Sequence, residues 1–277
     1  MKFGVSTFPT ADSIQPARLA RALEERGFDA LFFTEHTHIP ASRRTPYFAG
    51  GDMPPEYWES YEPFTALAVA AAASERLLIG TAICLVPQHH PLALAKRIAT
   101  LDHLSGGRFV FGVGGGWLVE ELENHGVRFE DRWKLTRESI LAMKACWTQK
   151  DAEFHGDFVD FDPVWSEPKP VQKPHPPIYI GANSRWGIER VVEFGDGWLP
   201  MREAPGFDEG FALLDQVCEE RGRDRNEISI MTEDGAESRD QVAELEARGV
   251  ERINFLLPTL DESAALKHLD SLIPLME

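Results

Sequence analysis

Short apolar runs alternate along this chain of 277 residues with longer segments that repeat apolar positions every three or four residues. The short runs are rich in Val, Ile, Leu and Phe, which is typical of buried strands, whereas the longer spacing is typical of amphipathic helices. The runs predict strands at residues 3–8, 30–34, 77–85, 109–113, 178–180, 198–200, 228–231 and 252–256. The segments between them predict helices at residues 16–26, 63–74, 92–104, 133–147, 186–194, 207–221, 239–248 and 261–272.

Eight strand–helix units in succession predict an α/β fold of the (β/α)8 TIM-barrel type. Barrels of this kind take roughly 250 residues, so we expect one domain spanning residues 1–277. The alternative is a doubly wound open sheet. It is disfavoured because the first strand-to-helix turn, Ser6-Thr7-Phe8-Pro9, lacks the GxGxxG pattern of dinucleotide-binding sheets.

Two insertions interrupt the alternation. Residues 37–59 contain several prolines, aromatic residues and the pair Gly50-Gly51, and form a long loop after the second strand. Long loops in compact domains are often functional, so this one is expected to be a lid. Residues 154–161 alternate apolar and polar positions around Gly156-Asp157, which predicts a small hairpin before the fifth strand.

The net charge and the amino-terminal sequence narrow the classes of molecule that this protein is expected to bind. A net charge of −17 and a pI near 5.0 argue against binding to nucleic acid or to an anionic membrane, and mean that an anionic ligand needs a local positive site. The first residues lack the pattern of a signal peptide, and no apolar run approaches the roughly 20 residues of a membrane span. We therefore expect a soluble, cytoplasmic protein.

The cysteines and one histidine pair are the residues whose types could bind a metal. Cys84, Cys146 and Cys218 lie far apart with no CxxC pair, which indicates reduced residues of the core. His89-His90 have no third ligand at a convincing spacing, so they are expected to be ordinary loop histidines and no metal is predicted.

Candidate chemistry follows the strands, because active sites of barrels are assembled at the carboxyl ends of the strands. Glu35 and His36 come directly after the second strand and beside the lid. They are either an acid–base or cofactor-contacting pair, since a carboxylate can tune a neighbouring histidine, or part of a solvated loop.

A glycine-rich turn ends the fourth strand. Gly114, Gly115 and Gly116 are followed by Trp117 and by a helical stretch that contains Glu120 and Glu121. Glycines allow a ring or a phosphate to approach the backbone closely, but a tight strand-to-helix turn also favours them. Both interpretations remain open from the residues alone.

A third segment joins the fifth strand to its helix. Small and polar residues with an arginine at a helix amino terminus suit an anion, because unpaired backbone N–H groups point outward there. The alternative is simple capping by Asn183 or Ser184 with a surface arginine. The segment is Gly181, Ala182, Asn183, Ser184 and Arg185.

Taken in order, these segments resemble the luciferase-like monooxygenase superfamily over nearly the whole chain, and in particular its F420-dependent oxidoreductase branch. An ordered series of motifs is more specific than any one of them. The series runs Phe33-Thr34-Glu35-His36, Leu78-Ile79-Gly80-Thr81-Ala82-Ile83, His90-Pro91, Leu101-Asp102-His103-Leu104-Ser105-Gly106-Gly107-Arg108, Gly112-Val113-Gly114, Lys169-Pro170-Val171-Gln172, Pro176-Pro177-Ile178-Tyr179-Ile180-Gly181-Ala182 and Gly195-Asp196-Gly197-Trp198-Leu199-Pro200.

The resemblance implies an F420 cofactor in the mouth of the barrel. It places a non-prolyl cis peptide, at Ala82-Ile83, under the ring, with residues 114–117 beside the ring and residues 181–185 at the phosphate. It also implies hydride transfer between the cofactor and a small organic substrate under the lid, with His36 exchanging a proton and Glu35 orienting it.

One position departs from the relatives. F420-dependent sugar and alcohol dehydrogenases carry a glutamate after the glycines of the fourth strand, whereas this chain has Trp117. Oxidation of sugar phosphates or simple alcohols is therefore disfavoured, and Trp117 is available to stack on the cofactor or substrate.

Two other functions fit the same resemblance. One is an FMN-dependent, two-component flavin monooxygenase, and the other is a non-catalytic barrel that binds a flavin. Members of the superfamily often associate through helices on the side of the barrel, so a homodimer is also an expectation.

Overall fold

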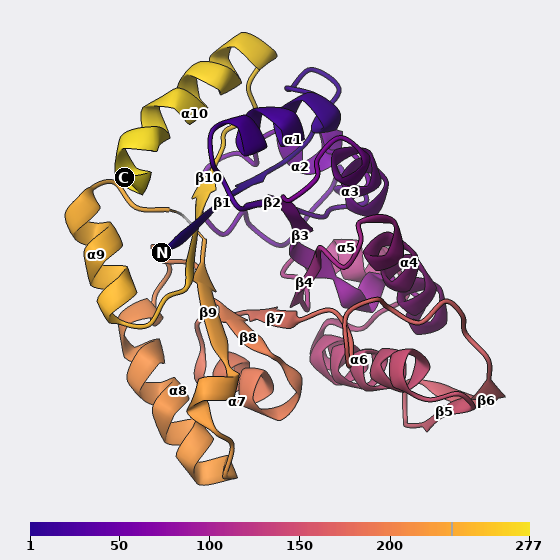
Figure 1. Ribbon diagram of the computed structural model, residues 1–277. Helices are drawn as coiled ribbons and strands as arrows, with labels where there is room; N and C mark the ends of the chain where they lie inside the picture. The colour runs from indigo at the N-terminus through magenta and orange to yellow at the C-terminus, as the bar shows by residue number, and fades with distance from the viewer. Residues whose placement is uncertain (234) are drawn as a thin grey trace.

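The computed structural model describes residues 1–233 and 235–277, and these residues form a closed barrel of parallel strands ringed by helices (Figure 1). Around the barrel the order is β1-β10-β9-β8-β7-β4-β3-β2, which confirms the predicted TIM-barrel fold. The strands are β1 (Lys2–Thr7), β2 (Ala30–Phe33), β3 (Leu78–Leu85), β4 (Phe109–Gly114), β7 (Ile178–Gly181), β8 (Gly197–Leu199), β9 (Ser229–Thr232) and β10 (Arg252–Leu256).

The predicted helices are present with small changes at their ends. Proline in the first turn begins α1, α3 and α4, where its missing N–H costs no hydrogen bond. The last helix was predicted to end at Leu272 but continues through Pro274 to Met276. The helices are α1 (Pro16–Glu25), α2 (Glu56–Glu59), α3 (Pro63–Ala72), α4 (Pro91–Leu104), α5 (Val119–Asn124), α6 (Arg132–Thr148), α7 (Arg185–Phe194), α8 (Phe207–Arg221), α9 (Arg239–Ala247) and α10 (Glu262–Met276), with 3-10 turns η1 (Val86–Gln88), η2 (Phe129–Asp131) and η3 (Arg225–Glu227).

Side chains of the apolar strands alternate between two layers. On β2, Leu31 and Phe33 belong to the large core between strands and helices, whereas Ala30 and Phe32 face the interior of the barrel. A Cβ atom on Gly80 would lie 2.7 Å from the Phe32 ring, so glycine makes room for that ring. All three cysteines are buried and unpaired, as predicted.

The predicted hairpin is present and slightly longer than expected. β5 (Ala152–His155) pairs antiparallel with β6 (Asp160–Val164). The carboxylate of Glu138, on α6, accepts hydrogen bonds from the backbone N–H groups of Phe158 and Val159, at 2.7 and 2.9 Å. The hairpin is thereby fixed to the outside of the barrel.

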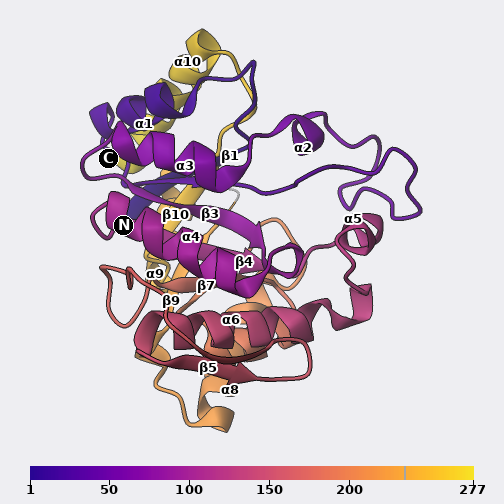
Figure 2. The ribbon, with the colours of Figure 1, turned by 90° about the vertical axis from the view of Figure 1, so that its right-hand side faces the viewer.

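The loop of residues 37–59 lies at one end of the molecule. It includes the short helix α2 and lies at the same end as α5, which follows β4 (Figure 2). Because all barrel strands run parallel, this is the end where the candidate residues after β2, β4 and β7 meet. Within the described part of the chain, every helix is too short or too polar to cross a bilayer.

Candidate active site at the mouth of the barrel

Ile83 and two glycines form the floor of the mouth. The pairing of β3 with β4 shifts register between Thr81 and Cys84, and the Ala82–Ile83 peptide bond is cis, as the resemblance implied. A Cβ atom on Gly114 would overlap Cδ1 of Ile83, and one on Gly181 would lie 3.0 Å from Cγ2 of Ile83. Glycine at both positions therefore makes room for the Ile83 side chain, which packs against the ends of β4 and β7 at the floor of the mouth.

His36 is held by a carboxylate that the sequence did not single out as its partner. Its Nδ1 lies 2.8 Å from Oε2 of Glu121 on α5, and both side chains are buried. The other oxygen of Glu121 accepts a hydrogen bond from the backbone N–H of Thr37, at 3.3 Å. With Nδ1 donating to the carboxylate, Nε2 is the ring atom free to exchange a proton, and it has no partner among the described residues.

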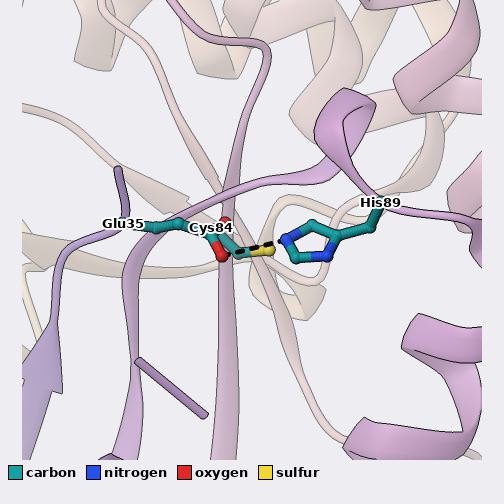
Figure 3. Close-up of side chains that lie close together, drawn as sticks. All are labelled: Glu35, Cys84 and His89. Carbon is teal, nitrogen blue, oxygen red and sulfur yellow. Dashed lines mark hydrogen bonds and ion pairs between the residues drawn. The ribbon is translucent and has the colours of Figure 1, made fainter. Parts of the chain in front are cut away.

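The expectation that Glu35 orients His36 is wrong. Successive side chains of an extended backbone point to opposite sides, so Glu35 points away from His36. Its Oε1 lies 2.9 Å from Nε2 of His89 (Figure 3). Its Oε2 accepts a hydrogen bond of 2.6 Å from the backbone N–H of Leu85. Glu35 thus supports the end of β3, beneath the mouth, rather than the histidine.

Glu35, Cys84 and His89 form a buried polar cluster (Figure 3). Their oxygen, sulfur and nitrogen atoms lie within 4.8 Å of one another, so His89 is not the ordinary loop histidine that was expected. Burial would raise the pKa of Glu35, but the hydrogen bonds from His89, Leu85 and Cys84 outweigh it and lower the pKa.

The donor types of this cluster are those that zinc accepts. In the structure its members bond one another: Nε2 of His89 lies 2.9 Å from Oε1 of Glu35, and the Cys84 thiol bonds the same carboxylate. Burial, reinforced by the adjacent Glu35 carboxylate, raises the pKa of Cys84 well above its ordinary value. The cluster as it stands is a hydrogen-bonded network that joins the end of β2 to the end of β3.

Aromatic side chains lie together beside His36. We call them the aromatic wall, and define it as Tyr47, Phe48 and Tyr57 of the lid together with Trp117. The Trp117 ring lies 6.3 Å from the His36 ring and 5.3 Å from Phe48, measured between centroids. Tyr57 lies 5.1 Å from His36, and burial raises the pKa of Tyr57, so its phenol stays neutral. A substrate beside His36 would therefore meet largely aromatic surface.

Short helix α5 also holds the lid in place. The Glu120 carboxylate accepts hydrogen bonds from the backbone N–H groups of Arg44 and Thr45, at 2.5 and 3.1 Å. Glu123 forms a forked pair with the guanidinium of Arg44, both oxygens at 2.9 Å from Nη2. Although burial opposes it, this donor set lowers the pKa of Glu120 to about 2. The lid is latched to α5 by ionised carboxylates.

The segment after β7 caps α7. The Ser184 hydroxyl accepts a hydrogen bond from the N–H of Gly187, and the Asn183 side chain bonds both the N–H and the carbonyl of Met201. Arg185 was expected to supply positive charge to this site, but its guanidinium pairs with Glu189 and Glu220, each at 3.0 Å. Its charge is therefore already compensated.

The residues at the mouth fit a cofactor that combines a ring with a phosphate. Gly114 and Gly181 let the Ile83 side chain lie close against the strand ends, so the floor beneath a bound ring would be apolar. In the first turn of α7, the N–H groups of Arg185 and Trp186 have no acceptor within residues 1–233 and 235–277, and such groups bind phosphate. These features suit F420 and FMN equally.

The opposite side of the mouth carries polar residues that sequence reasoning missed. Glu233, directly after β9, accepts a hydrogen bond of 2.8 Å from Nδ2 of Asn254 and another from the hydroxyl of Ser6. Polar residues at alternate positions of β1 and β10, among apolar neighbours, were the available signal. Glu121 had a clearer signal in the sequence, because it lies in the short helix that directly follows the glycine turn.

The sequence profile described as luciferase-like monooxygenase matches residues 1–257. The chain belongs to this family. It is thus a luciferase-like barrel of the superfamily of oxidoreductases and monooxygenases, and the proteins similar to it include F420-dependent and FMN-dependent enzymes.

Individual relatives span both cofactors. An uncharacterised protein of Mycobacterium tuberculosis is 38% identical over 275 residues, covering 96% of this chain and 95% of its own length. The FMNH2-dependent dimethylsulfone monooxygenase of Pseudomonas putida is 38% identical over 142 residues, covering 50% of this chain and 39% of its own. An F420-dependent secondary alcohol dehydrogenase, solved with an F420–acetone adduct, superposes with a TM-score of 0.78 at 17% identity over the full length of both chains, which supports the fold.

Proposed function

We propose that this luciferase-like protein transfers hydride between F420 and a small organic substrate, with His36 exchanging the accompanying proton. The observation that carries the proposal is the buried His36–Glu121 pair beside the glycine floor. Bound F420 would supply or accept the hydride. The protein holds the cofactor and the substrate in position and supplies the proton.

Glu121 positions His36 in this proposal. It fixes the ring by accepting a hydrogen bond from Nδ1–H, which directs Nε2 toward the open side. In the reducing direction, a carbonyl, alkene or nitro compound would receive one hydride from the cofactor and one proton from Nε2, and solvent would reprotonate the histidine. With the lid closed, the aromatic wall would shield the transfer step from bulk water, and reprotonation would follow when the lid opens.

A second candidate function is an FMN-dependent monooxygenase of the two-component type. It is favoured by the 38% identity, over half of this chain, to the dimethylsulfone monooxygenase. In that case His36 would serve the oxygenation of the substrate, and reduced FMN would come from a separate reductase.

Titration of the purified apoprotein with F420 and, separately, with FMN separates the candidates. Ring fluorescence is followed at physiological salt. Tight binding of F420 alone supports the proposal, and a preference for FMN replaces it by the monooxygenase. Binding of neither refutes both. Binding without turnover of any carbonyl, alkene or nitro compound would instead support a non-catalytic flavin-binding barrel.

A further inference from the structure

A basic groove runs along the outside of the barrel between α6 and α7. Its volume is about 230 Å³, and it is lined by residues from the first turns of α6, from α7 and from the end of α8. The whole protein carries a net charge of −17, so an accumulation of cations here is unusual for this molecule. The basic side chains are Lys134, Arg137, Arg190 and Arg221.

The carboxylates of the groove are already paired. Glu193 bonds Arg137 at 2.5 Å, and Glu189 bonds Arg185 at 3.0 Å. The remaining cations, on Lys134, Arg190 and Arg221, have no acceptor among the described residues. Three positive charges are therefore available to an anionic ligand.

Arg190 is the central cation of the groove. Its guanidinium lies 4.2 Å from the centroid of the Trp133 ring and is partly buried. Burial, together with the nearby Arg132, lowers the pKa of Arg190 even though the charges of Glu189 and Glu193 oppose the shift, and neither carboxylate bonds its guanidinium. A cation that is desolvated without an acceptor gains more from an added anion than a fully solvated one does.

The groove begins beside the proposed cofactor site. A Cβ atom on Gly115 would lie 2.8 Å from the Trp133 ring, so this ring packs directly behind the glycine turn. Trp186, in the first turn of α7, and Arg190 are four residues apart, which places them on one face of the helix about 6 Å apart along its axis. A chain leaving the phosphate site at the start of α7 would meet these side chains in order.

We propose that this groove binds the oligo-γ-glutamate tail of F420, which extends from the phosphate of that cofactor. The inference rests on the proposed use of F420. FMN ends at its phosphate and would leave the groove empty. The tail carries one or more carboxylates per glutamate, which matches the row of unpaired cations, and its methylenes match the exposed ring of Trp186.

The test compares F420 carrying several glutamates with F420-0, which has the phosphate but no glutamate. Binding to the whole protein is measured by ring fluorescence at low and at physiological salt. The tailed form should bind about tenfold more tightly, as expected for three exposed ion pairs, and the difference should shrink as salt rises. The triple variant Lys134→Gln, Arg190→Gln, Arg221→Gln should bind both forms with the affinity of the wild type for F420-0.

Two controls keep the result interpretable. Lys267→Gln removes an exposed lysine of α10, remote from the groove, and should leave the tenfold difference unchanged. Arg190→Lys keeps the charge and should retain most of the difference. The affinity for F420-0 reports whether each variant still has an intact cofactor site.

Three results would overturn the inference. Equal binding of both forms by the wild type refutes the groove and leaves F420 as the cofactor. Binding of neither form refutes the proposed function and the groove with it. If the triple variant keeps the tenfold difference but sediments as a smaller species than the wild type, the groove is an interface between copies of the chain.

Discussion

Replacing Gly114 by Ala should damage the cofactor site while leaving the barrel folded. The added Cβ would overlap Cδ1 of Ile83, the far end of a flexible side chain. Carbon atoms in contact lie about 3.5–4.0 Å apart, so this methyl must move by about 1 Å or more. Because Ile83 is partly exposed at the mouth, the easiest movement takes the methyl into the space proposed for the ring.

How much stability and cofactor affinity a variant loses depends on which atom the added methyl group displaces. Overpacking costs about 1–3 kcal/mol, and a mobile methyl places Gly114→Ala near the lower end. Loss of cofactor affinity should be at least about tenfold, or 1.4 kcal/mol. Gly112→Ala is the contrasting variant, because its Cβ would overlap the carbonyl oxygen of Thr81. A backbone oxygen within the sheet cannot turn aside, so this variant should lose about 3 kcal/mol or more, or fail to fold.

Urea unfolding and cofactor titration measure the two quantities separately. Ile83→Val removes Cδ1 and leaves Cγ1 at 3.2 Å from the added atom, so it should restore cofactor binding to Gly114→Ala. Alone, Ile83→Val should cost about 0.5–1.5 kcal/mol of unfolding free energy. Wild-type affinity in Gly114→Ala, or no recovery in the double variant, would refute the assignment of this floor.

Three further predictions concern the carboxylates. Glu121→Gln should lower kcat roughly 10- to 100-fold and move the pH profile of kcat. The double variant Glu121→Gln, His36→Ala should lose no more activity than His36→Ala alone. Additive losses in steady-state kinetics would contradict the pairing. Glu35→Gln should lower the unfolding free energy by about 1–3 kcal/mol, because it weakens the acceptor of His89 in a buried site, and an unchanged urea midpoint would count against this. The folded pKa of Glu120 is lowered from 4.5 to about 2, so its latch contributes stability that is fully present above pH 4.5 and is lost as the pH falls toward 2. Proteolysis of the lid should therefore accelerate over that range, and Glu120→Gln should flatten the dependence.

The barrel could be predicted from the sequence because most of its strands are buried on both faces. Strands such as β2 and β4 then appear as short apolar runs, and the helices between them keep their own spacing. The ends of the helices were harder to predict. Pro274 marks a common end of a helix, yet α10 continues past it to Met276.

The site could be predicted in part. His36 and the glycines could be located from their places after strands, because topology alone brings those places together. Their partners could not, since Glu121 and His36 are 85 positions apart and meet only through the packing of α5 against the lid. Arg185 shows the converse error, because its charge is visible in the sequence whereas its compensation by Glu220 depends on how α7 packs on α8.

The arrangement of α5 links the lid to the proposed proton donor. Glu120 and Glu121 are adjacent on a helix of six residues, and one holds the lid backbone while the other holds His36 and the N–H of Thr37. A movement of α5 that releases the lid must therefore also change the hydrogen bond that orients His36. In an enzyme that must admit substrate and then exclude water, this shared support would keep the histidine correctly placed only while the lid is closed.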